Sequence, residues 1–141
     1  MVIVGKTAIG ALSDVRVLIV DDDEDSLVVM QTALEYAGAV ITMARSAKAA
    51  SAALCHFTPD VIVADLRMPD HDGLAFARDL QRIPSMRGIP ILAVSGYDEL
   101  YPRRDLHDAG FIGILLKPLI FPDLVQAVAA LADAKKADRQ P

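Results

Sequence analysis

Side chains suited to metal binding and nucleophilic chemistry follow four short apolar runs of the sequence. Asp21 and Asp22 follow VLIV, Asp65 follows VIVA, Ser95 follows ILAV, and Lys117 follows ILL. In an open parallel sheet the carboxyl ends of the strands meet in one crevice, where ligands bind. We therefore expect three carboxylates, a hydroxyl and an ammonium group to lie in a single pocket.

Such a pocket would suit phosphoryl transfer with Mg²⁺ as the cofactor. If Asp21, Asp22 and Asp65 converge to within about 4 to 6 Å, each like-charge pair costs about 3 to 4 kcal/mol at an effective dielectric constant near 20. Mg²⁺ would remove that cost, because it binds one or two carboxylates together with phosphate oxygens. Lys117 adds a compact positive charge for phosphate oxygens, and Ser95 adds a hydroxyl donor. An aspartate can attack phosphorus to form an acyl phosphate, and Asp65 is the candidate because it stands alone at a strand end.

The elements that must position these side chains alternate regularly along the chain. Branched apolar runs predict strands at 16–20, 40–43, 61–64, 89–94 and 112–116. Apolar residues at helical spacing, together with caps and prolines, predict helices over 25–37, 46–57, 73–82, 102–108 and 122–134. This alternation favours an α/β fold, a doubly wound five-stranded parallel sheet flanked by five helices. We expect residues 1–13 to form an N-terminal extension, 14–134 the domain, and 135–141 a polar tail.

Composition narrows the classes of function. The chain has 141 residues, of which 53% are hydrophobic, and this is enough for one domain with a core. Its 14 basic and 19 acidic residues give a net charge of −5, which argues against direct binding to nucleic acid. No apolar run is long enough to span a membrane and no signal peptide is recognisable, so we expect a cytoplasmic protein without membrane attachment.

Several other residues are interpreted structurally. Cys55 lies in an apolar stretch that predicts a helix, so we expect a buried and inert thiol. Val28 and Val29 widen the apolar stripe of the first helix; core packing is the favoured interpretation, and a partner-docking face is the alternative. Gly73 is expected to start a helix, and His71 to be a solvated loop residue.

The motifs VLIVDDDEDSL, DVIVADLRMPDHDGL, PILAVSG and AGFIGILLKPL, in this order, resemble the receiver domain of bacterial two-component response regulators. The resemblance runs from about residue 14 to residue 134. It implies that Asp65 is the phosphoacceptor, that Asp21 and Asp22 hold Mg²⁺, and that the backbone carbonyl of Arg67 also ligates the metal. Ser95 then matches the switch hydroxyl.

The resemblance also implies a role for Lys117 and a place in signalling. Lys117 matches the family's lysine before a proline, in a Lys-Pro step that is often cis. A histidine kinase or a histidine phosphotransfer protein would donate the phosphoryl group to Asp65, and the phosphorylated stand-alone receiver would act on a downstream protein target. Homodimers could form through the fourth helix, fifth strand and fifth helix. Catalysis would be limited to its own phosphorylation and dephosphorylation.

Two departures from the family pattern affect the expected switching. Ile114 occupies a position where the family often has an aromatic residue whose rotamer follows the switch hydroxyl. Switching would then run through movement around residues 96–101. Tyr97 and Arg67 stand where family members vary, beside the path of the attacking water, so the sequence does not indicate the lifetime of the phosphate.

Two other classes of function stay open at this point. The chain could be a vestigial receiver that acts as a phosphorylation-independent interaction module. It could also be a phosphatase with an aspartyl nucleophile, but such enzymes carry a second aspartate two residues after the first. Arg67 stands at that position here.

Overall fold

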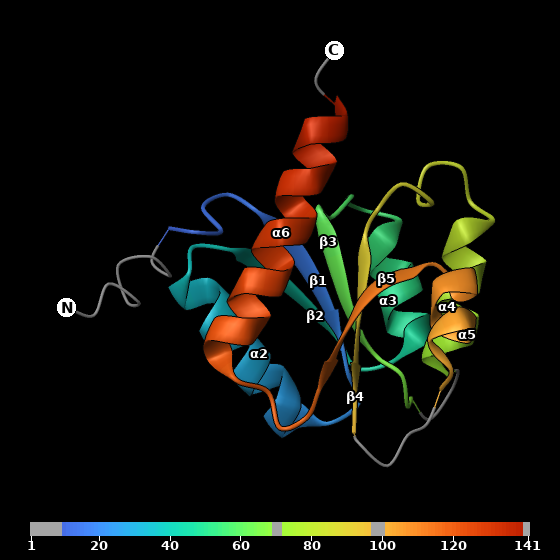
Figure 1. Ribbon diagram of the computed structural model, residues 1–141, viewed down its shortest axis with the longest axis horizontal. Helices are drawn as coiled ribbons and strands as arrows, with labels where there is room; N and C mark the ends of the chain where they lie inside the picture. Colours follow the sequence, from blue (N-terminus) through green and yellow to red (C-terminus); the bar gives the residue numbers. More distant parts are fainter. Residues whose placement is uncertain (1–9, 69–71, 97–100, 140–141) are drawn as a thin grey trace.

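The computed structural model describes residues 10–68, 72–96 and 101–139. Within these ranges one sheet is built from five parallel strands in the order β2-β1-β3-β4-β5 (Figure 1). The strands are β1 (Arg16–Val20), β2 (Val40–Ala44), β3 (Val61–Asp65), β4 (Ile91–Ser95) and β5 (Phe111–Leu116). The helices of the same ranges are α2 (Glu24–Tyr36), α3 (Ala47–Leu54), α4 (Gly73–Gln81), α5 (Arg103–Ala109) and α6 (Phe121–Arg139). The predicted doubly wound α/β fold is confirmed.

The sheet buries both of its faces under helices, which is why its central strands are apolar throughout. Helices α2 and α6 cover one face, while α3, α4 and α5 cover the other (Figure 1). In β1, Val17 and Ile19 belong to the core under α2 and α6, and Leu18 and Val20 belong to the core on the opposite face. A run such as VLIV therefore contributes side chains to both cores.

Side-chain caps begin three of the helices where the sequence changes from strand to turn. Asp23 accepts a hydrogen bond from the backbone N–H of Ser26, Ser46 accepts one from Ala49, and Asp72 accepts one from Ala75. Each cap satisfies a backbone donor that has no partner inside the helix. Asp23 and Asp72 thereby set where α2 and α4 begin.

The packed part of the chain reaches beyond the expected helix and strand ends. Leu12 is fully buried in the core under α2, and its backbone N–H donates to the carbonyl oxygen of Ala37 at 2.9 Å. The last helix, expected to end near Ala134, continues to Arg139. Its continuation contains good helix formers, and the ammonium group of Lys135 donates to the carbonyl oxygen of Pro59 at 3.3 Å.

Two interpretations of apolar residues are wrong. Cys55 is exposed rather than buried, because α3 ends at Leu54 and Cys55 is its C-terminal cap. Val28 and Val29 are 51% and 40% exposed, because the core face of α2 is formed by other residues of the helix, such as Leu27 and Met30. Core packing of the two valines is therefore excluded.

None of the helices in the described ranges has the length and apolarity that a membrane crossing requires.

Candidate functional site

Two of the predicted carboxylates lie at the point where the winding of the sheet reverses. The chain passes from β1 to β2 on one side and then returns to β3 on the other side, so β1 and β3 are direct neighbours. Asp21 follows the last residue of β1, and Asp65 is the last residue of β3. Their side chains therefore project from adjacent strand ends into the crevice where ligands bind in open α/β sheets.

The three predicted carboxylates come together. Oxygen atoms of Asp21, Asp22 and Asp65 all lie within 4.8 Å of one another. Asp21 is fully buried and Asp65 is 5% exposed, whereas Asp22 is exposed to solvent. Such a set of hard oxygen ligands, with one side open to water, fits Mg²⁺, which usually keeps several of its waters. The donor atoms therefore match the expected cofactor chemically.

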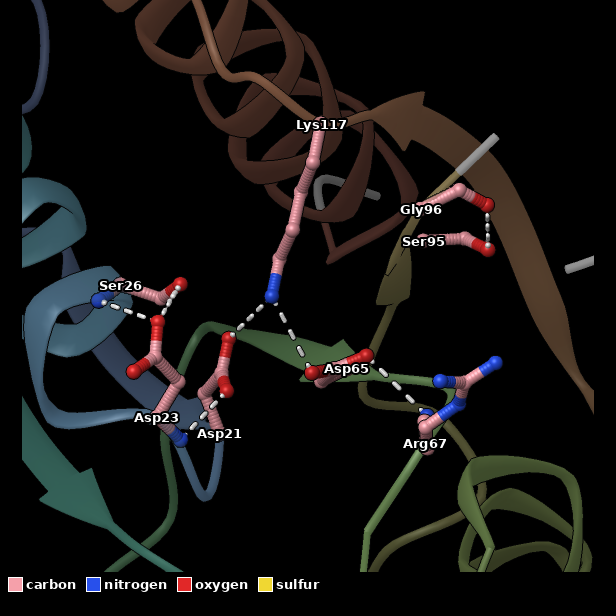
Figure 2. A network of polar contacts seen from close by, with 8 residues as sticks. All are labelled: Asp21, Asp23, Ser26, Asp65, Arg67, Ser95, Gly96 and Lys117. Atoms are coloured by element: carbon pink, nitrogen blue, oxygen red, sulfur yellow. Dashed lines mark hydrogen bonds and ion pairs between the residues drawn. The ribbon is translucent and has the colours of Figure 1, made fainter. Parts of the chain in front are cut away.

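Lys117 lies between two of these carboxylates (Figure 2). Its ammonium nitrogen donates to Oδ2 of Asp21 at 3.0 Å and to Oδ2 of Asp65 at 3.2 Å. Its backbone N–H donates to the carbonyl oxygen of Ser95 at 2.8 Å, which holds the lysine at the end of β5 beside β4. The following peptide bond to Pro118 is cis, as the resemblance implies. Lys117 thus neutralises part of the charge that the clustered carboxylates create.

The pKa values of Asp21 and Lys117 reflect this arrangement. Burial raises the pKa of Asp21 from 3.8 to about 6, against the lowering effects of a hydrogen bond from the backbone N–H of Asp23 and of Lys117, while the charge of Asp65 raises it further. Partial burial acts to lower the pKa of Lys117, but the hydrogen bonds and charges of Asp21 and Asp65 outweigh it, so that its pKa is raised. Lys117 therefore stays charged at neutral pH.

Ser95 and Arg67 lie beside this cluster with other hydrogen-bond partners. Ser95 is fully buried at the end of β4, and its hydroxyl donates to the carbonyl oxygen of Gly96 at 3.0 Å. Figure 2 shows this hydroxyl turned toward Gly96 and away from Asp65. Arg67 donates its backbone N–H to Oδ1 of Asp65 at 3.0 Å, and its side chain is exposed. The roles implied for both residues stay predictions.

Two contributions to the site were not recognised from the sequence. The backbone N–H of Asp23 donates to Oδ1 of Asp21 at 2.9 Å, while the side chain of Asp23 caps α2. Gly73 packs against the backbone next to the predicted phosphoacceptor. A Cβ atom at Gly73 would lie 2.7 Å from Cα of Leu66 and 2.8 Å from the carbonyl oxygen of Asp65. The sequence signal for this contact was a glycine at the start of an otherwise ordinary helix.

Other expectations fall outside the described residues. His71 and Tyr97 lie there, as do residues 97–100 of the segment around 96–101 through which switching was expected to run. Ile114, the residue in the aromatic position, is described and is 37% exposed on β5.

Comparisons with known proteins agree with this geometry. A family model described as the response regulator receiver domain matches residues 17–129. An uncharacterized 14.6 kDa protein of Leptolyngbya boryana is 31% identical over 83% of this chain and 89% of its own length. A protein-glutamate methylesterase/protein-glutamine glutaminase of Methanospirillum hungatei is 36% identical over 85% of this chain, but the match spans only 35% of that longer protein.

A solved structure supports the same assignment. The CheY-like response regulator receiver domain protein of Methanospirillum hungatei superimposes with a TM-score of 0.81 at 25% identity, covering 89% of this chain and 99% of that one. The sheet order, the acidic crevice and the family match over most of the chain agree, and the chain belongs to the response regulator receiver domain family.

Proposed function

We propose that this receiver accepts a phosphoryl group on Asp65 and thereby changes its affinity for other proteins. The observation that supports the proposal best is the cluster of Asp21, Asp22 and Asp65, whose oxygens lie within 4.8 Å of one another with Lys117 bridging two of them. Folding alone does not require three carboxylates at one point, because each like-charge pair is unfavourable. A site for a divalent cation and a phosphoryl group accounts for all four residues.

In the proposed reaction an oxygen of Asp65 attacks the phosphorus of a phosphohistidine. The new bond is the acyl phosphate P–O bond, and the P–N bond to the donor histidine breaks with its electrons going to the imidazole nitrogen. Asp21, Asp22, Asp65 and the backbone carbonyl of Arg67 would hold Mg²⁺. When bound, the metal neutralises the charge on the carboxylates and on the transferred phosphoryl oxygens.

Lys117 and Ser95 would then contact the phosphoryl oxygens. The ammonium group of Lys117 already lies 3.2 Å from Oδ2 of Asp65, so a small movement brings it to a phosphoryl group on that residue. The hydroxyl of Ser95 donates to Gly96 in the unphosphorylated protein and must rotate to donate to a phosphoryl oxygen. Exchange of these partners would shift the balance between two conformations.

Chemical phosphorylation tests the role of Asp65. Incubation with acetyl phosphate and Mg²⁺ should add the mass of one phosphoryl group, as measured by intact-protein mass spectrometry. Asp65→Asn should abolish the addition, whereas the exposed control Asp133→Asn should not. Failure of the wild-type protein to gain mass under these conditions would refute the proposal.

The phosphodonor protein would dock beside the crevice. A depression of about 240 Å³ between α2 and the segment after β5 is lined by Asp23, Asp25, Ser26, Val29, Lys117, Pro118 and Leu119. Around it, Val28, Val29, Ile120 and Phe121 are 51%, 40%, 60% and 44% exposed. Exposed apolar side chains that border a polar reaction site suit a protein partner that must bring its phosphohistidine to Asp65.

Two phosphodonors separate docking from chemistry. Val29→Asp should slow phosphorylation by a histidine kinase or histidine phosphotransfer protein at least about tenfold, since it places a charge in an apolar contact. The same variant should react with acetyl phosphate at the wild-type rate, because the small donor makes no docking contact. Val40→Asp, which is 56% exposed on the far edge strand β2, serves as the control. Equal effects of Val29→Asp on both donors would contradict this docking surface.

We also propose that the output surface lies on α5, β5 and α6. On β5 the side chains of Ile112, Ile114 and Leu116 are 55%, 37% and 57% exposed, and an unpaired edge with exposed apolar residues favours association. A downstream target or a second copy of the chain would bind there after phosphorylation. Ile114→Asp should prevent any phosphorylation-dependent dimer seen by light scattering; an unchanged dimer would place the contact elsewhere.

The vestigial-module alternative makes a different prediction about the metal. It predicts no Mg²⁺ binding by calorimetry, whereas the proposed function predicts a single site that Asp21→Asn weakens. The phosphatase alternative requires turnover of a phosphate ester. With Arg67 in place of a second aspartate, we expect none.

A further inference from the structure

A separate groove of about 630 Å³ opens at the amino-terminal end of the sheet, opposite the acidic crevice. Thr58 precedes β3, Ile89 and Pro90 precede β4, and Gly110 precedes β5, so the groove lies at the strand starts. Its volume falls in the usual range of ligand-binding sites. The other sides are formed by the connection between α4 and β4, by the end of α5 and by the last turns of α6.

The floor of this groove is apolar and partly open to solvent. Ile89, Pro90, Ile112 and Leu131 line it, and Ile112 is 55% exposed. A second hollow of about 390 Å³ between α5 and β5 shares Ile112 with the groove, together with His107. The exposed isoleucine therefore lies where the two hollows meet, with room for an apolar side chain of a partner.

The charged side chains that line the groove are basic. Arg87, His107 and Lys135 come from three different elements, and Gln81 adds an amide. Among the described residues that line the groove there is no aspartate or glutamate, although the chain as a whole carries 19 acidic and 14 basic residues. The groove is thus complementary to negative charge in a protein whose net charge is −5.

The walls of the groove are held in place by hydrogen bonds. The connection before β4 is a series of turns in which Met86 and Arg87 both donate their backbone N–H groups to the carbonyl oxygen of Ile83. Gly110, at a φ of 112°, closes α5 by donating to His107. Lys135 ties α6 to the carbonyl oxygen of Pro59. Because these walls are already ordered, binding of a ligand does not have to order this part of the protein.

The helix ends around the groove restrict where an anion can bind. Both α4 and α5 direct their carboxyl-terminal ends toward it, as Gln81 and Gly110 show. The negative ends of helix dipoles disfavour a concentrated anion such as a phosphate, which binds instead at helix amino-terminal ends. Carboxylates on the same helix axes would be disfavoured too, so their attraction must come from the positive charges of Arg87 and Lys135. The apolar floor favours a ligand that also carries an apolar group.

We propose that this groove binds an acidic peptide segment of a partner protein, with an apolar side chain of that segment on Ile112 and its carboxylates facing Arg87, His107 and Lys135. The surface lies at the opposite end of the sheet from Asp65. The groove shares Ile112 with the proposed output surface on α5, β5 and α6. It differs from that surface in that we expect the unphosphorylated chain to bind, so the inference can fail while phosphorylation of Asp65 is confirmed.

Fluorescence anisotropy with two labelled peptides tests the proposal on the full chain. One peptide of about ten residues carries glutamates and leucines, and its control carries lysines in place of the glutamates. The acidic peptide should bind at least about tenfold more tightly. Arg87→Glu should reduce that affinity about tenfold, whereas Arg45→Glu, exposed at the other end of the sheet, should not. Ile112→Ser should weaken binding, and Ile120→Ser, which lies outside the groove, should leave it unchanged.

Amide chemical shifts identify the site directly. The acidic peptide should shift the residues that line the groove, and Asp65→Asn should bind the peptide as the wild type does. The proposal is overturned if the two peptides bind equally, if neither binds, or if the shifts fall on α2. It is also overturned if inorganic phosphate shifts the same residues at similar concentration, which would indicate a small anion. Self-association of the wild-type chain that is lost in Arg87→Glu would also overturn the proposal, because a second copy would then be the occupant.

Discussion

Lys117→Met should destabilise the metal-free protein and make its stability depend more strongly on Mg²⁺. In the structure the ammonium group lies 3.0 Å from Asp21 and 3.2 Å from Asp65, and its side chain is 26% exposed. Methionine keeps most of the length of the side chain and removes the charge. The substitution leaves two buried carboxylates facing each other without a cation.

The size of the effect follows from these distances. At an effective dielectric constant of about 20, each contact is worth about 5 kcal/mol of Coulomb attraction, and the cost of desolvating the three groups opposes it. Removing one partner from a buried ion pair typically costs about 3 to 5 kcal/mol. Protonation of one carboxylate absorbs part of that cost, so we expect a loss of about 3 kcal/mol in the free energy of unfolding at pH 7.

Urea unfolding in excess EDTA and in excess Mg²⁺ measures both parts of the prediction. Mg²⁺ should stabilise Lys117→Met by about 1 to 3 kcal/mol more than it stabilises the wild type, since the metal no longer competes with the ammonium group. Lys135→Met is the control: it removes a lysine whose ammonium group donates to the carbonyl oxygen of Pro59, far from the acidic crevice, and it should respond to Mg²⁺ as the wild type does.

A Lys117→Met protein within about 1 kcal/mol of the wild type in EDTA would refute the ion-pair reasoning. An equal Mg²⁺ response of the two proteins would refute the competition between lysine and metal.

Three further predictions rest on single residues. The folded-state pKa of Asp21 is raised from 3.8 to about 6, so the folded protein holds a proton that the unfolded chain has lost at intermediate pH. As the pH rises from 4 to 7, the metal-free wild type should therefore lose up to about 3 kcal/mol of stability relative to Asp21→Asn. Urea unfolding of both proteins across this pH range checks the sign. Gly73→Ala should lower the free energy of unfolding by about 1 to 3 kcal/mol, because its Cβ would meet backbone atoms at 2.7 and 2.8 Å. Gly88→Ala is the control, because a Cβ there meets open space and should not destabilise the protein. Equal stability of the two variants in urea unfolding would contradict the contact at Gly73. Cys55 should react with a maleimide in the native protein within about tenfold of its rate in urea, and strong protection would show that the thiol is buried after all.

The acidic crevice could be predicted because its geometry follows from strand direction alone. Once β1 and β3 are parallel strands of one sheet, residues at their carboxyl ends lie at the same edge, whatever the order of the other strands. The apolar runs before Asp21 and Asp65 were therefore enough to predict that these two side chains lie at the same edge of the sheet. The partner of Asp21 could not be predicted in this way. Lys117 reaches it across the ends of β4 and β3, and that path exists only because the strand order is β2-β1-β3-β4-β5.

Exposure was the property that local patterns predicted least well. Val28 and Val29 are as apolar as their buried neighbours, yet α2 turns them away from the sheet. The run FIGILL of β5 resembles a buried central strand, but β5 is an edge strand and three of its five apolar side chains, those of Ile112, Ile114 and Leu116, are exposed. Cys55 was expected inside a helix and lies just beyond its end. For β5 the deciding factor was the strand order, and for the valines and Cys55 it was the exact placement of the helix face and of the helix end.

The sequence by itself determined the order of strands and helices along the chain, the residues at each strand end and hence the acidic character of the crevice. These depend on periodicity and on residues adjacent in the chain, which a sequence displays directly. Only the tertiary structure decided that Lys117 bridges Asp21 and Asp65, that Gly73 packs against the backbone of Asp65, and that a groove lined by basic side chains opens at the opposite end of the sheet. Those features depend on which strands pair and which become edges, and pairing is set by the balance of burial over the whole fold.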